Sequence, residues 1–164
     1  MQENFQSSIK LGTHFNLHKI CGEWEGSTKT WFEPNQLSDE SPMRGTIKSI
    51  LGGRFIMHEY KGKLGDKDFE GVAIMGYSFV EDKFECAWVD SFHMGTGILF
   101  SQGVKEDKPF SVSGTYGVKG YPERWGWKTE ITIVNDNEII ITAYNVSPQG
   151  QADKATETTY KRIK

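Results

Sequence analysis

Residues 21–34 read CGEWEGSTKTWFEP, and this stretch carries the strongest indication of the fold. Small or polar residues alternate with bulky ones along it, which is the two-residue period of a β-strand. Two glycines bracket Trp24, so the backbone there can bend sharply and a neighbouring strand can approach closely. We expect Trp24 to close one end of a barrel, and we predict that the inward face of this strand consists of Trp24, Gly26, Thr28, Thr30 and Phe32.

The same two-residue period continues to the end of the chain, in segments that each end at Gly, Asn, Asp or Pro. Short connections between consecutive strands favour an up-and-down antiparallel meander, and a meander of about ten strands hides its edges only by closing into a barrel. We therefore predict an all-β, up-and-down antiparallel β-barrel, with an open sandwich as the alternative. The predicted strands are 22–33, 43–51, 54–62, 67–79, 83–92, 96–104, 110–118, 124–135, 138–147 and 154–163.

The 164 residues are enough for one well-buried domain, so we predict a single domain over 1–164. Only the first 20 residues are compatible with helix. Thr13 there is expected to cap a short helix that places Leu17 and Ile20 on one side. We expect this segment to form a small lid or plug, and residues 21–164 to form the barrel.

Composition and charge exclude several classes of partner. The net charge is −3 and no run of five basic residues occurs, so nucleic acid is not expected as a partner. No stretch approaches the roughly 20 apolar residues of a membrane span, and the N-terminus does not resemble a secretory signal. Cys21 and Cys86 share no metal-ligand spacing, and two cysteines are too few for a disulfide scaffold. A reduced, cytoplasmic protein with two buried thiols is expected.

Six motifs follow one another along the chain: Gly22–Gly26, Ile50–Phe55, Phe69–Gly71, Gly76–Tyr77, Trp88–Ser91 with Thr96, and Glu157–Arg162. In this order and spacing they resemble a lipocalin-like bacterial family known as domain of unknown function 1579, within the calycin superfamily. The resemblance covers roughly residues 15–163, and one departure is Ser78, where the family has Asp. It implies a calycin-type barrel without an established activity. In such barrels an arginine of the last strand stacks over the first-strand tryptophan, which assigns Arg162 and Trp24 to the structural barrel end.

Six residues are candidates for contact with a ligand inside the barrel. Asp90 follows Phe84, Cys86 and Trp88 on one strand face, so its carboxylate needs a partner, either a ligand head group or a backbone turn or arginine. Tryptophans on one strand face offer flat apolar walls, although core filling explains them equally well. His93 is interpreted as a surface imidazole at a barrel rim. The candidates are Trp88, Asp90, Trp125, Trp127, Tyr60 and His58.

Three functions remain open. The leading hypothesis is a non-enzymatic intracellular barrel that binds a small apolar or amphipathic molecule and needs no cofactor. The second is a nitrobindin-like haem protein acting on nitrogen oxides, but no histidine follows His93, so the late histidine that ligates haem in nitrobindins is missing and haem binding is not expected. The third is a structural module that forms a homodimer through outward residues such as Trp31. No catalytic residue and no metal site is predicted, because nucleophile-elbow, zinc-protease and phosphate-loop motifs are all missing from the sequence.

Overall fold

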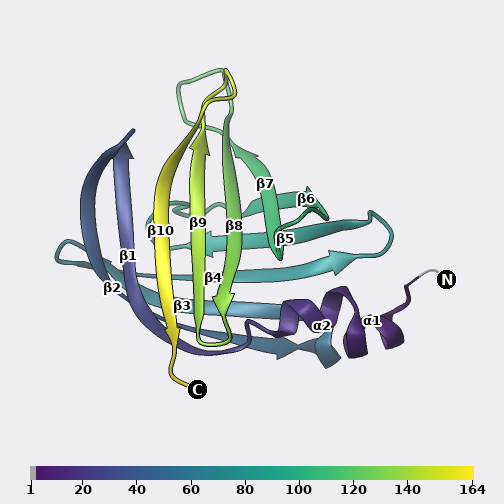
Figure 1. The fold of residues 1–164 in the computed structure, drawn as a ribbon. Helices are drawn as coiled ribbons and strands as arrows, with labels where there is room; N and C mark the ends of the chain where they lie inside the picture. The colour runs from purple at the N-terminus through teal and green to yellow at the C-terminus, as the bar shows by residue number, and fades with distance from the viewer. Residues whose placement is uncertain (1–2) are drawn as a thin grey trace.

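A computed structural model describes residues 3–164 (Figure 1). Within this range two short α-helices precede ten β-strands, and each of the ten predicted segments corresponds to one strand. The all-β prediction is therefore confirmed. The elements are α1 Phe5–Leu11, α2 Thr13–His18, β1 Gly22–Glu33, β2 Gln36–Ile50, the 3₁₀ turn η1 Leu51–Gly53, β3 Phe55–Leu64, β4 Lys67–Ser78, β5 Lys83–Asp90, β6 Leu99–Val104, β7 Phe110–Tyr116, β8 Trp125–Asn135, β9 Glu138–Val146 and β10 Ala152–Arg162.

The strands form a closed antiparallel barrel in which each strand pairs with its neighbours in sequence and β10 returns to β1. The closing pair runs from Trp24 opposite Arg162 to Thr30 opposite Thr156. Closure gives both terminal strands a partner on each side, which an open sandwich would not do. The shortest pairing described is between β6 and β7, with two residue pairs. The barrel prediction is confirmed over the sandwich.

The opening stretch owes its glycines to the close approach of β10. A Cβ atom on Gly22 would lie 2.3 Å from Nη1 of Arg162, and one on Gly26 would lie 1.8 Å from the carbonyl oxygen of Thr159. Both distances are far below van der Waals contact, so neither position accepts a larger side chain without displacing β10. The glycines around Trp24 are therefore needed for closing the barrel.

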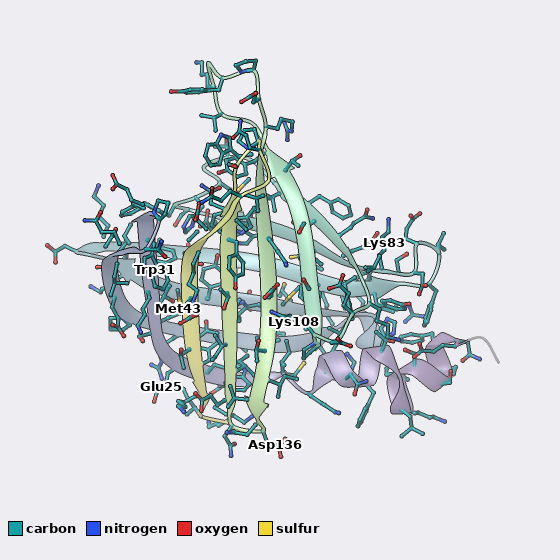
Figure 2. The ribbon with its side chains drawn as sticks, turned by 45° about the horizontal axis from the view of Figure 1, so that its top comes forward. Glu25, Trp31, Met43, Lys83, Lys108 and Asp136 are labelled. Carbon is teal, nitrogen blue, oxygen red and sulfur yellow. The ribbon has the colours of Figure 1, made fainter. Side chains whose placement is uncertain are left out.

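The predicted inward face of β1 is correct for Trp24, Thr28 and Thr30, which are all buried. It is wrong for Phe32, whose side chain is 64% exposed. The pairing of β1 with β2 shifts register after Thr30, and such a bulge breaks the alternation of faces. Trp31 is half-buried, and the Lys154 ammonium lies 5.4 Å from the centre of its ring. Figure 2 shows Asp136 at the lower margin of the molecule.

Strand β2 begins seven residues earlier than predicted, at Gln36 instead of residue 43. Pro42 and the polar residues before it read as a loop, because proline removes a ladder hydrogen bond from a strand interior. In the structure this part of β2 pairs with β1 only, since the pairing with β3 starts at Met43. It is thus a one-sided edge, where proline is tolerated.

The N-terminal segment contains two helices where the sequence predicted one. Asn4 caps α1 through a capping box with Ser7. The cap residue of α2 is Gly12, so the prediction that Thr13 caps it is wrong; the Thr13 amide and hydroxyl both donate to the Glu3 carboxylate instead. Helix α2 packs against β3 and β4. Leu17 and Ile20, which were predicted to face the same side, are both buried in the core.

The end of the barrel beside the helices is closed by Trp24, which is 1% exposed. Its indole N–H donates to the carbonyl oxygen of Ile20 at 3.0 Å, and its ring stacks at 6.2 Å from that of Tyr160. The Arg162 guanidinium lies 4.3 Å from the centre of the Trp24 ring. This guanidinium also donates to the carbonyl oxygens of Lys19, Cys21 and Asp136.

Neither described helix is long and apolar enough to cross a membrane. Both cysteines are free thiols; Cys86 is buried and Cys21 half-buried.

Candidate ligand-binding site

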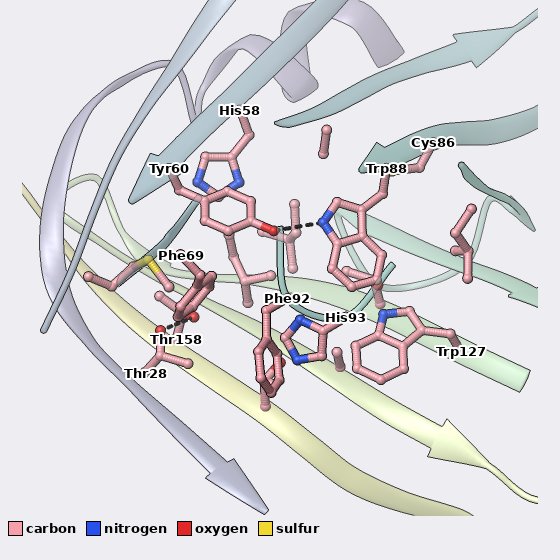
Figure 3. Close-up of a pocket in the computed structure, with 18 of the residues that line it drawn as sticks. Thr28, His58, Tyr60, Phe69, Cys86, Trp88, Phe92, His93, Trp127 and Thr158 are labelled. Carbon is pink, nitrogen blue, oxygen red and sulfur yellow. Dashed lines mark hydrogen bonds between the residues drawn. The ribbon is translucent and has the colours of Figure 1, made fainter. Parts of the chain in front are cut away.

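A cavity of about 110 Å³ occupies the lumen of the barrel (Figure 3). Inward residues of nine strands, β1 to β6 and β8 to β10, and the loop after β5 line it. It reaches the surface at the end opposite Trp24, because Phe92 and His93 belong to its lining and keep exposed surface. Its lining is mostly apolar and aromatic, with a few hydroxyl and imidazole groups.

Two predicted tryptophans form one wall of this cavity. The rings of Trp88 and Trp127 stack with centres 5.4 Å apart and an interplanar angle of 19°. The Trp88 indole N–H donates to the Tyr60 hydroxyl at 2.7 Å (Figure 3). Burial raises the pKa of Tyr60 above its usual value, and this hydrogen bond offsets only part of the effect. Tyr60 therefore faces the lumen as a neutral phenol.

His58 and Tyr160 form a buried polar pair. His58 Nε2 lies 3.0 Å from the Tyr160 hydroxyl. Burial lowers the pKa of His58 to about 4, so the ring is neutral at physiological pH. Gly45 leaves the space for this pair, because a Cβ atom there would lie 2.3 Å from the Tyr160 hydroxyl and 2.7 Å from His58 Nε2. Gly71 does the same for Tyr60, whose hydroxyl would lie 2.2 Å from such an atom.

Hydroxyl and thiol groups elsewhere in the lumen are uncharged as well. The hydroxyls of Thr28 and Thr158 hydrogen-bond each other at 2.7 Å. Burial raises the pKa of Cys86 to about 12, so this thiol is protonated and is not a reactive nucleophile. In the part of the chain that the structure describes, no group of three or more His, Cys, Asp or Glu residues could hold a metal ion. The cavity interior suits binding of an uncharged molecule.

The structure brings four of the six candidates to the cavity, namely His58, Tyr60, Trp88 and Trp127. Trp125 and Asp90 are not in its lining. Trp125 is half-buried at the first position of β8, beyond the enclosed part of the lumen. The Asp90 carboxylate is turned into the loop after β5, where Oδ1 accepts the backbone N–H of Met94 at 2.7 Å. Its partner is thus a backbone turn, one of the two alternatives that the sequence left open.

Three aromatic residues at the mouth of the cavity were not among the six candidates from the sequence: Phe69 on β4, and Phe92 and His93 in the loop after β5. His93 was interpreted as a surface imidazole at a barrel rim; the residue as a whole is exposed, whereas its side chain is 23% exposed and lies against the mouth of the cavity. Its ring centre lies 5.5 Å from that of Trp88 and 5.6 Å from that of Trp127. The signal in the sequence was the pair Phe92–His93, one residue after a strand that ends in an acid.

No curated protein matches the chain. Among solved structures, the chain is similar to an S-type phycobiliprotein lyase from Guillardia theta, with a TM-score of 0.57 and 11% identity over 99% of both chains. At this identity the likeness concerns the fold alone. A protein of unknown function from the DUF3598 family of Nostoc punctiforme is 11% identical, and the match covers 90% of this chain and 48% of that one. Its TM-score of 0.41 is too low to support a conclusion about this chain.

The family model described as "protein of unknown function (DUF1579)" matches residues 11–162, nearly the range over which the sequence motifs resemble that family. The chain, a lipocalin-like barrel, belongs to the DUF1579 family.

Proposed function

We propose that this barrel is a binding protein whose lumen takes up one small, flat, apolar or amphipathic molecule. The observation that carries the proposal is the cavity itself, which is enclosed by strands, lined by aromatic side chains and open at one end. Ligand sites in proteins are typically concave and apolar, with a few placed polar groups. The hydroxyl of Tyr60 and the ring of His93 are among the polar groups of this lining.

The volume sets the size of the ligand. An engineered apolar cavity of about 150 Å³ holds one benzene molecule, whereas drug-sized ligands occupy about 300–1,000 Å³. The present cavity, at about 110 Å³, therefore suits a single-ring compound. This supports a small ligand over haem, which is far larger. The phycobiliprotein lyase among the structural neighbours supports the fold and not a substrate, because the identity is 11%.

Toluene is a suitable probe, because it is flat, apolar and small. We expect saturable binding with a Kd on the order of 0.1–1 mM, followed through the indole N–H signals of Trp88 and Trp127 in ¹H–¹⁵N NMR spectra. Ala73→Leu fills the lumen, because Ala73 lines the cavity. Ala87→Leu is the matched control on the next strand, since Ala87 pairs with Ile74 and does not line the cavity.

Toluene affinity should fall at least tenfold in Ala73→Leu and stay within twofold of wild type in Ala87→Leu, with both variants folded by circular dichroism. Ala143→Leu provides a second filling variant on β9, because Ala143 also lines the cavity. No saturable shift in the wild-type protein, or unchanged binding in both filling variants, would contradict the proposal.

A further inference from the structure

The loop between β5 and β6 holds an aspartate–histidine pair at the mouth of the cavity. Asp90 ends β5, and its side chain has 0% exposed surface. Its Oδ2 lies 2.5 Å from Nδ1 of His93, and its Oδ1 accepts the backbone N–H of Met94 at 2.7 Å. Both carboxylate oxygens are thus engaged in holding this loop and the imidazole.

This arrangement fixes which nitrogen of His93 carries the proton. An ionised carboxylate only accepts hydrogen bonds, so we assign a proton to Nδ1, which donates to Asp90. In the neutral ring, Nε2 then has a free lone pair and acts as an acceptor. Within residues 3–164 the contact with Asp90 is the one hydrogen bond of this imidazole. Nε2 is therefore available to a bound molecule.

Aromatic rings surround the imidazole on several sides. The centre of the Phe92 ring lies 4.7 Å from that of His93, and the rings of Trp88 and Trp127 complete the enclosure (Figure 3). Hydrogen bonds are stronger in such a shielded place than in water, and flat rings favour a flat ligand. An acceptor in an aromatic enclosure recognises a ring that carries a hydrogen-bond donor.

We propose that Nε2 of His93 accepts a hydrogen bond from the ligand, and that the ligand is a single-ring aromatic compound with a hydroxyl donor, a phenol. Asp90 is a positioning residue that holds the ring and fixes the proton of its neutral form on Nδ1, which leaves Nε2 as the acceptor. This inference rests on the proposed function, since it names the ligand class of the same cavity. It assigns polar anchoring to His93, which was not among the candidate anchors Asp90, Tyr60 and His58 that the sequence indicated.

Phenol and toluene test the donor, because they have the same number of non-hydrogen atoms and differ in the hydroxyl. His93→Phe removes the acceptor and keeps an aromatic ring at the mouth. One neutral hydrogen bond corresponds to a change of about three- to tenfold in affinity. We expect the ratio of phenol to toluene affinity to fall by this factor in His93→Phe; the ratio is compared because a change of shape at the mouth affects both probes alike. His93→Gln, whose amide oxygen can still accept, should recover part of the ratio.

Asp90→Asn tests the positioning role. The Met94 amide should retain the side-chain oxygen of the asparagine, which directs its NH₂ group toward His93 Nδ1. The imidazole proton then moves to Nε2, which becomes a donor. Long-range ¹H–¹⁵N spectra, recorded above the ordinary histidine pKa, should show Nδ1–H in the wild type and Nε2–H in the variant. The variant should lose its preference for phenol and bind pyridine, which only accepts, more tightly than the wild type does.

The possible results separate the two proposals. If toluene binds but the phenol ratio is unchanged in both His93→Phe and Asp90→Asn, the role of His93 is refuted and cavity binding stands. If neither probe binds the wild-type protein, both proposals fail. If the ratio falls but the spectra show no change of tautomer in Asp90→Asn, the positioning role of Asp90 is refuted.

Discussion

Replacing Arg162 by alanine tests how the barrel is closed, because this side chain connects the last strand to the start of the first. The contact with the Trp24 ring contributes about 0.5–2 kcal/mol, depending on how well it is shielded from water. The hydrogen bond to the Cys21 carbonyl, at 2.5 Å, is partly buried and charge-assisted, which adds about 1.5 kcal/mol. The bonds to Lys19 and Asp136 are exposed and contribute less. We expect Arg162→Ala to lower the free energy of unfolding by about 2–4 kcal/mol.

The assay is urea denaturation followed by far-ultraviolet circular dichroism, with the slope of the transition compared between variants. Lys161→Ala is the matched control, because the neighbouring Lys161 forms an exposed ion pair with Glu138, and such pairs contribute about 0–1 kcal/mol. Arg162→Lys should fall between the two, since lysine keeps the charge and loses the planar fork. A loss in Arg162→Ala no larger than that in Lys161→Ala would refute the account of closure.

Three further predictions concern the lumen. Gly45→Ala should destabilise the protein by about 1–3 kcal/mol in the same urea assay, because the added Cβ would lie 2.7 Å from His58 Nε2. Gly97→Ala is the control and should be nearly neutral, because a Cβ atom there would lie 3.4 Å from its nearest neighbour. Burial lowers the pKa of His58 from 6.5 to about 4, so the unfolded state binds a proton at this residue more readily than the folded state does. The free energy of unfolding should therefore be highest above pH 6.5 and should fall by about 2–4 kcal/mol as the pH is lowered towards 4. Unfolding free energies measured at each pH should lose this component in His58→Gln, and equal slopes in both proteins would contradict it. Cys86 should resist alkylation in the folded protein, because burial raises its pKa to about 12. Peptide mass spectrometry should therefore detect the label at the half-buried Cys21 first, and equal labelling of the two cysteines would contradict this.

The barrel could be predicted from the sequence because its information is local and repetitive. Alternation fixes which face of a strand is buried, since a shift of one residue reverses every side chain. This is why Tyr60, Trp88 and Trp127 were predicted to lie inside, and all three line the cavity. Alternation fails where a register shift interrupts it, and Phe32 is exposed for this reason.

The mouth of the cavity could not be predicted in the same way. Loops have no period, so the alternation that places the strand residues does not indicate that His93 lies at the mouth of the lumen. Asp90 is the last residue of its strand, and its carboxylate binds the following turn instead of continuing the inward face. The first residues of β2 were not predicted as strand, because proline is disfavoured inside a sheet and Pro42 lies among them. Only the pairing in the structure shows that this part of β2 is an edge, where proline is tolerated.

The central claim is that the lumen holds a small aromatic molecule, and a crystal structure of the protein soaked with bromobenzene tests it most directly. The bromine atom gives an anomalous signal that locates the ligand without reference to any assumed pose. We predict one strong peak inside the barrel, in the cavity bounded by Tyr60, Trp88 and Trp127. Anomalous peaks confined to the outer surface, with the lumen closed by its own side chains, would contradict it.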